Sequence, residues 1–63
     1  MNGFYSLVIA QLKANGYRFL RQGTGSYELW TNGLRHQTVS KNMPARAMAN
    51  QIMKQAGIAY RFP

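Results

Sequence analysis

The chain contains no cysteine, a single acidic residue and a single histidine among its 63 residues. Without cysteine it has neither a disulfide framework nor a thiolate metal site. Because Glu28 is the only side-chain carboxylate, paired-carboxylate chemistry, two-metal chemistry and a Ser-His-Asp set are all excluded. One histidine, His36, also excludes a His-rich metal constellation. We therefore expect neither a metal nor a cofactor.

Long apolar runs are missing as well. No segment approaches the ~20 apolar residues needed to span a bilayer, and the N-terminus lacks the features of a signal peptide. We expect a cytoplasmic protein that does not enter a membrane. The length predicts one domain over residues 1–63. A chain of this size buries only about 60% of its unfolded surface, so a partner or self-association is expected to add stability.

Positive charge is the abundant feature. Eight basic residues give a net charge of +7. A surplus used only for solubility would have acids among the bases, whereas basic side chains that neutralise phosphates predict salt-sensitive binding of nucleic acid. RNA is the favoured polyanion, with an acidic protein or a membrane surface as alternatives. The basic residues are Lys13, Arg18, Arg21, Arg35, Lys41, Arg46, Lys54 and Arg61.

Apolar spacing and glycines predict the elements of the fold. Tyr5, Val8, Ile9 and Leu12 lie on one face of a helix that runs from about Tyr5 to Asn15, and glycine follows as a cap. Segments 17–22, 26–31 and 34–40 read as strands. A last helix is predicted to open with Pro44 at its first position and to end at Gly57, with Arg46, Asn50 and Lys54 on one polar side.

The order helix, three strands, helix predicts an α+β fold of the double-stranded-RNA-binding-like αβββα type. Two-layer packing places both helices on one face of a three-stranded antiparallel sheet. The tail 58–63 shows no period, and a short strand, packing on a partner and fraying all remain open for it.

Asn32-Gly33 predicts a two-residue type I′ hairpin. The register would then pair Leu29 with His36 and Tyr27 with Thr38. One face of the sheet would carry Glu28, Trp30, Gln37 and Val39, and the other Tyr27, Leu29, His36 and Thr38. Neither face is cleanly apolar, so composition does not choose the buried one.

Several motifs together resemble the HicA toxins of bacterial toxin–antitoxin modules. They are Gly-Tyr-Arg-Phe-Leu-Arg-Gln-Gly-Thr-Gly-Ser at 16–26, an aromatic residue at Trp30, Thr-Val at 38–39, a basic-Asn-x-Pro helix start at 41–44 and Ile-Met-Lys-Gln-Ala-Gly at 52–57. The resemblance covers roughly residues 5–58. It implies an mRNA interferase that cleaves mRNA without a metal and that a HicB-like antitoxin neutralises in a hetero-oligomer.

In the family, the residue after Gly-Ser on the second strand is a histidine taken to be catalytic, but here it is Tyr27. An imidazole with a pKa near ~6.5 serves as base or acid at neutral pH. A tyrosine hydroxyl, ionising near pH ~10, is a poor base but can stack on an unpaired RNA base. If the Tyr27 face is the open one, Trp30 and Val39 point inward with Phe19 or Leu20.

The expected catalytic positions are therefore Tyr27 and, as a substitute for the missing imidazole, His36, which the predicted register places diagonally at about 7–8 Å on the same face. The expected RNA-binding residues are Arg18, Arg21, Ser26, Arg35, Lys41, Arg46 and Lys54.

Three interpretations of Tyr27 stay open. The chain is a toxin inactivated deliberately, a natural member that has drifted into a binding remnant, or an RNA-binding module of the same fold that never cleaved RNA. The sequence fixes neither the RNA preference nor the oligomeric state.

Overall fold

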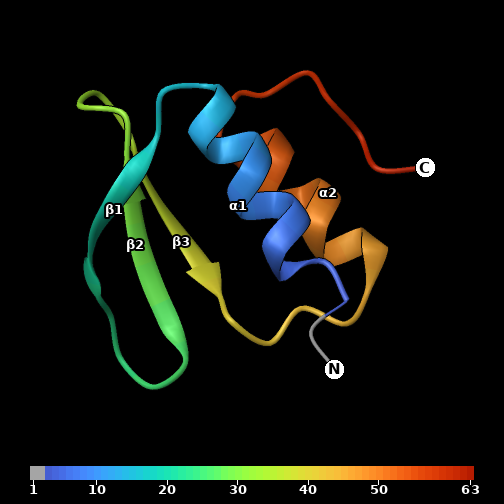
Figure 1. Ribbon diagram of the computed structural model, residues 1–63, viewed down its shortest axis with the longest axis horizontal. Helices are drawn as coiled ribbons and strands as arrows, with labels where there is room; N and C mark the ends of the chain where they lie inside the picture. Colours follow the sequence, from blue (N-terminus) through green and yellow to red (C-terminus); the bar gives the residue numbers. More distant parts are fainter. Residues whose placement is uncertain (1–2) are drawn as a thin grey trace.

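The computed structural model describes residues 3–63, in which the elements follow the predicted order. The three strands form an antiparallel sheet in the order β1-β2-β3, and the two helices lie together against one face of it (Figure 1). The predicted α+β fold with αβββα order is confirmed. The elements are α1 (Tyr5–Ala14), β1 (Arg18–Gln22), β2 (Tyr27–Thr31), β3 (His36–Ser40) and α2 (Arg46–Gln55).

Helix α1 ends within one residue of its predicted end, because a local motif stops it. Gly16 adopts the left-handed conformation with φ 85°. Its N–H donates to the carbonyl of Lys13, and the N–H of Tyr17 reaches back to the carbonyl of Leu12 at 2.9 Å. This is a Schellman motif, in which the two bonds satisfy carbonyls that the helix leaves free. Tyr17 and Leu12 are both buried, so the motif also turns the chain into the core.

Helix α2 ends with the same motif at Gly57, whose φ is 76°. The N–H of Ile58 donates to the carbonyl of Met53 at 2.9 Å. The predicted start of this helix was wrong by two residues: the cap is Ala45, with an extended backbone, and Pro44 precedes it. No side chain caps the helix there, because the alanine at this position has no side-chain acceptor.

The core lies between the helices and the inner face of the sheet. Trp30 and Val39 point into it, as predicted, and Glu28 and Gln37 share that face. The expectation for Phe19 holds only in part, since half of its surface stays exposed while its ring meets that of Trp30 edge-on at 5.9 Å. The buried apolar residues are Val8, Leu12, Tyr17, Trp30, Val39, Met43, Ala49, Met53, Ala56, Ile58 and Phe62.

The predicted two-residue turn between β2 and β3 was wrong. A type I′ turn needs positive φ at both central residues, and no non-glycine residue in the described chain has positive φ, so Asn32 does not meet the requirement. Instead, the Asn32 side chain accepts hydrogen bonds from the backbone N–H groups of Leu34 (2.9 Å) and Arg35 (2.7 Å). The loop becomes four residues long, and Thr31 pairs with His36.

The register of β2 and β3 is therefore shifted by two residues from the prediction. Tyr27 pairs with Ser40, and Leu29 pairs with Thr38. Because side chains alternate with a period of two, a shift of two leaves every residue on its predicted face. The assignment of faces survives although the pairing does not.

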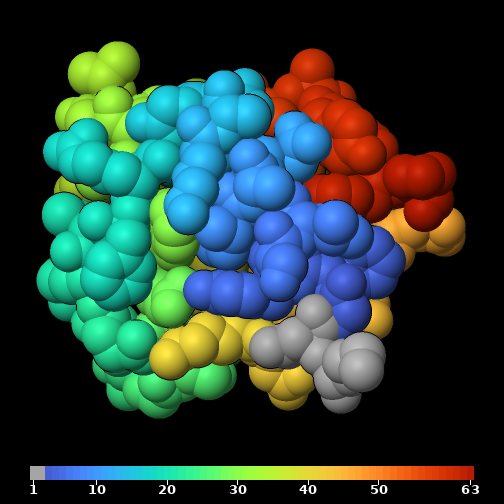
Figure 2. Space-filling model, viewed as in Figure 1, coloured from blue at the N-terminus to red at the C-terminus, as the bar shows by residue number. Residues whose placement is uncertain are grey.

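The C-terminal tail lies on the protein's own helices, an arrangement that the three sequence alternatives did not include. Phe62 is buried and meets the ring of Phe4 edge-on at 5.8 Å. The carboxamide of Asn50 on α2 makes two hydrogen bonds to the Phe62 backbone: it accepts from the N–H at 2.7 Å and donates to the carbonyl at 3.2 Å. The space-filling view shows the tail, in red, directly against the blue α1 (Figure 2).

Candidate nucleic-acid interface

The only acidic side chain is inside the protein. Glu28 is 9% exposed and accepts hydrogen bonds from the Tyr5 hydroxyl at 2.5 Å and from the Trp30 indole N–H at 3.1 Å. Burial, the hydrogen bond to Glu28 and the charge of Glu28 raise the pKa of Tyr5 to about 12. All eight cations thus share a protein surface on which no acidic side chain competes with a bound polyanion.

Tyr27 lies on the face of the sheet that the helices leave open. Its side chain is 50% exposed, and its strand neighbours alternate with it, since Glu28 and Trp30 are buried. Leu29 is partly buried on the open face, and Thr38, its partner on β3, is exposed. The open face therefore presents an aromatic ring beside a small apolar and hydroxyl surface, which suits stacking of an unpaired base.

His36 does not lie beside Tyr27, which corrects the predicted diagonal pair. His36 pairs with Thr31, whereas Tyr27 pairs with Ser40 at the other end of the hairpin. Thr31 is four residues from Tyr27 along β2, so the backbone positions of Tyr27 and His36 are separated by roughly 13 Å along the strand, at about 3.3 Å per residue. A single phosphodiester between them would not be within hydrogen-bond reach of both groups.

A β-bulge brings two of the predicted arginines to the open face. Arg18 pairs with Thr31 and Arg21 pairs with Leu29, and the register shifts between Phe19 and Arg21. In a regular strand, residues three apart point to opposite faces. The extra residue of the bulge restores Arg21 to the same face as Arg18. Arg21 and Tyr27 line the same depression.

Arg35 is engaged with the end of α2. Its Nη1 donates to the carbonyl of Gln55, the last residue of the helix, at 3.0 Å. A cation at this position satisfies a free carbonyl and meets the negative end of the helix dipole. This contact gives Arg35 a structural task apart from the RNA contact expected from the sequence.

The other predicted residues are spread over the molecule. Ser26 and Lys41 meet at the far end of the sheet, where the Lys41 N–H donates to the Ser26 carbonyl at 2.8 Å. Arg46 is exposed at the first turn of α2 and Lys54 at its last turn. Lys54 lies in one depression with residues that the sequence analysis did not single out.

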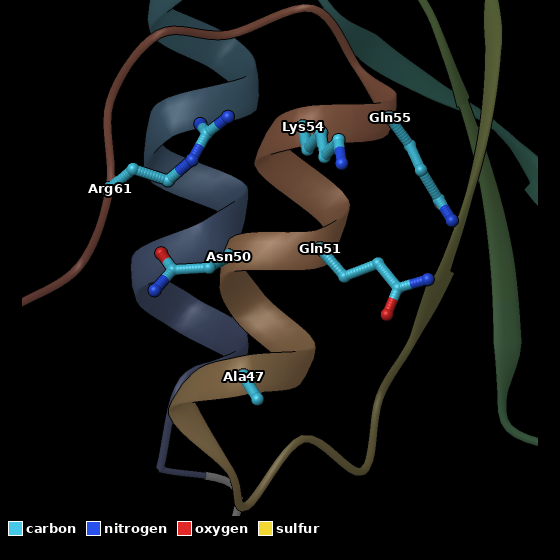
Figure 3. Close-up of a pocket in the computed structure, with 6 residues that line it drawn as sticks. All are labelled: Ala47, Asn50, Gln51, Lys54, Gln55 and Arg61. Carbon is cyan, nitrogen blue, oxygen red and sulfur yellow. The ribbon is translucent and has the colours of Figure 1, made fainter.

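Those residues are the glutamines of α2 and an arginine of the tail. Gln51, Lys54, Gln55 and Arg61 line a depression on the outer side of α2, together with Asn50 and Ala47 (Figure 3). Gln51 and Gln55 extend from the helix toward β3, whereas Asn50 lies on the side of the tail. The spacing of Gln51 and Gln55 by four was a visible signal, but no sequence pattern places Arg61 beside them.

Comparisons with known proteins add no relative, because no family model, curated protein or solved structure matches the chain. Over residues 3–63, neither helix has the length and apolar character needed to cross a membrane.

Proposed function

We propose that this protein binds single-stranded RNA through the open face of its sheet, as the toxin component of a HicA-type toxin–antitoxin module. The observation that carries the proposal is the burial of Glu28, which leaves eight cations and an exposed Tyr27 on a surface without acidic side chains. Exposed aromatic rings flanked by cations bind unpaired bases by stacking while the cations hold phosphates.

The module assignment rests on the motifs of the chain. The Gly-Ser before Tyr27, the Thr38-Val39 strand and the Ile-Met-Lys-Gln-Ala-Gly segment at 52–57 resemble HicA toxins. The Gly-Ser pair leads into β2, and the last segment forms the end of α2. The expected partner is a HicB-like antitoxin in the cytoplasm, whose contact surface would carry acids to meet a net charge of +7.

Cleavage of mRNA by this class of toxin is expected to need an imidazole where the chain has Tyr27. Metal-independent cleavage requires a base for the 2′-hydroxyl proton and an acid for the leaving 5′ oxygen. Tyr27, which is half exposed and lies beside Leu29 and Thr38, supplies a hydroxyl. A hydroxyl of this type donates a hydrogen bond to a phosphate but is a weak base near neutral pH.

The test is cleavage of a single-stranded message by the protein and by its Tyr27→His variant, with metal chelated. We expect both proteins to bind the RNA and only the histidine variant to produce fragments. Tyr27→Phe serves as the control, since it keeps the ring and removes the hydroxyl. Fragments from the unchanged protein would mean that another group, with His36 the first candidate, performs the chemistry.

A second candidate function is a non-catalytic RNA-binding module. The separation of Tyr27 and His36 by roughly 13 Å along the strand favours it, because within residues 3–63 no imidazole stands beside Tyr27. If Tyr27→His binds RNA as the parent does but leaves it intact, the toxin assignment fails and this module is the remaining function. If neither protein binds RNA, both candidates fail.

A further inference from the structure

Three surface depressions of the protein share lining residues and therefore lie next to one another, in a row that we call the path. The first lies beside the β1–β2 turn and includes Arg21, Tyr27 and Thr38. The second also contains Tyr27 and Thr38, and it reaches α2 at Gln51 and Gln55. The third contains the same two glutamines and lies on the outer side of α2. The path leads from the open face of the sheet past the edge strand β3 to the other layer of the molecule.

The far end of this path carries two cations from different elements. Lys54 lies in the last turn of α2, and Arg61 lies in the tail. The Nη1 of Arg61 donates to the carbonyls of Ile58 (2.6 Å) and Tyr60 (2.8 Å), which fixes the direction of the side chain. A guanidinium has five N–H donors in a fixed fork, so a group anchored through one nitrogen can still bind a phosphate oxygen with the other.

Between Arg21 at one end of the path and Lys54 and Arg61 at the other, the path is lined by carboxamides. Gln51 and Gln55 extend from α2 toward β3 (Figure 3), and the Oε1 of Gln55 accepts from the Gln37 amide at 2.9 Å. A carboxamide both donates and accepts hydrogen bonds, as base edges do. Arg21 at one end and Lys54 and Arg61 at the other suit phosphates, and the carboxamides between them can donate to and accept from base edges. This arrangement matches a strand of alternating phosphates and bases.

The shape of the path selects the form of the nucleic acid. The molecule is 28 × 28 × 15 Å, and the path passes from one layer to the other around the edge of the sheet. A duplex bends only at substantial cost over such a short length, but a single strand follows a turning groove. We propose that Lys54 and Arg61 form a second phosphate-binding site, on the outer side of α2, for a single RNA strand that passes Tyr27 and then turns around the β3 edge.

This inference rests on the proposed function, and its test separates the two. The intact protein is titrated with labelled single-stranded RNAs of about 4, 8 and 12 nucleotides, a range that spans typical single-strand sites, and with a duplex of the longest length. Lys54→Gln and Arg61→Gln are compared with Lys13→Gln. Lys13 and Lys54 are each the ninth residue of a ten-residue helix, so the two lysine variants remove the same charge from the same position near a helix C-terminus, at different places on the surface.

The second site predicts a length effect. The unchanged protein gains affinity as the RNA lengthens, and Lys54→Gln and Arg61→Gln reduce that gain while leaving the shortest RNA unaffected. Each variant lowers the slope of log affinity against log salt by about 0.7, the value for one lost contact to a single strand. Lys13→Gln keeps both the slope and the gain, and unfolding curves of all variants show that each one is folded.

Each alternative result points to a different failure. The second site is overturned if Lys54→Gln and Lys13→Gln show the same length effect and salt slope, or if the duplex binds as tightly as the single strand. Either result leaves RNA binding by the sheet intact. Absence of RNA binding by the unchanged protein overturns the proposed function together with this inference. Binding of the shortest RNA weakened as much as the longest would also overturn the second site, since it would show one common contact region.

Discussion

Substitution of Gly57 by alanine tests whether Arg35 belongs to the helix rather than to an RNA site. A Cβ at position 57 would lie 3.1 Å from Nη1 of Arg35, closer than ordinary van der Waals contact. A Cβ at Gly16 would meet nothing within 4 Å. Both glycines end a helix by the same motif, with φ of 76° and 85°. Gly16→Ala is therefore a matched control for Gly57→Ala.

The expected costs can be separated into a shared and a specific part. An alanine held in the left-handed conformation costs about 1–2 kcal/mol, and this cost applies at both positions. At position 57 the guanidinium must also shift by a few tenths of an ångström, which weakens its 3.0 Å hydrogen bond to the carbonyl of Gln55. A solvent-exposed cation at a helix C-terminus contributes about 0.3–1 kcal/mol. Gly57→Ala should accordingly destabilise the protein more than Gly16→Ala, by at most about 1 kcal/mol.

Urea unfolding followed by the fluorescence of the buried Trp30 measures both variants. The same substitutions are then made in the Arg35→Gln background, where the specific part is already lost. In that background, Gly57→Ala and Gly16→Ala should lower the free energy of unfolding by the same amount, because the coupling between contacting residues disappears when one of them is removed. Equal costs in the unchanged protein, or an excess that persists in the Arg35→Gln background, would refute the assignment of Arg35 as the cap of α2.

Two further predictions concern the interior. Below about pH 10 the raised pKa of Tyr5 contributes to the free energy of unfolding, and this contribution is lost as the pH rises through about 12. Urea unfolding from pH ~8 to ~12 should therefore show a steeper loss of stability for the protein than for Tyr5→Phe. Parallel curves for the two proteins would contradict this prediction. Asn50→Ala removes two hydrogen bonds to the backbone of Phe62 and should cost about 1–3 kcal/mol. Amide exchange at Phe62 should quicken in this variant, with Asn42→Ala unchanged as the surface control.

The elements of the fold were predictable because local signals set their ends. Gly16 and Gly57 follow the two helices, and each one supports bonds that stop the helix at that point. The alternation along β2 predicted which side chains share a face but not which face is buried. Trp30 and Val39 are buried, which agrees with the inner face expected if the Tyr27 face is the open one. Pro44 misled the prediction of the α2 start, since the chain stays extended through Ala45 before the helix begins.

The hairpin register was beyond the sequence pattern because side chains in the loop decide it. Asn32-Gly33 predicts a tight turn from backbone preferences alone. The actual loop depends on the Asn32 carboxamide and on the Thr31 hydroxyl, which accepts from the Gly33 N–H at 3.0 Å and donates to the Arg35 carbonyl at 2.8 Å. These two side chains make four hydrogen bonds that favour a longer loop, and no periodicity in the strands reveals them.

The candidate interface was predictable only in part, for a related reason. Tyr27, Arg21 and Lys54 were singled out by residue type and motif, whereas Arg61 joins the path only because the tail folds back on α2. The buried state of Glu28 also depended on a contact across 23 residues of sequence, from the Tyr5 hydroxyl. Long-range contacts of this kind set where the charges lie, and composition reports only how many there are.

The two functional hypotheses depend on the hairpin in different ways. Binding requires only that Tyr27, Leu29 and Thr38 share the open face, and a register shift of two residues preserves faces. Catalysis by Tyr27 with His36 requires that they be neighbours, and the same shift separates them by roughly 13 Å. The correction to the loop therefore leaves the RNA-binding argument unchanged and removes the geometric support for His36. A histidine at position 27 becomes the decisive substitution, because it restores an imidazole to the open face without depending on the register.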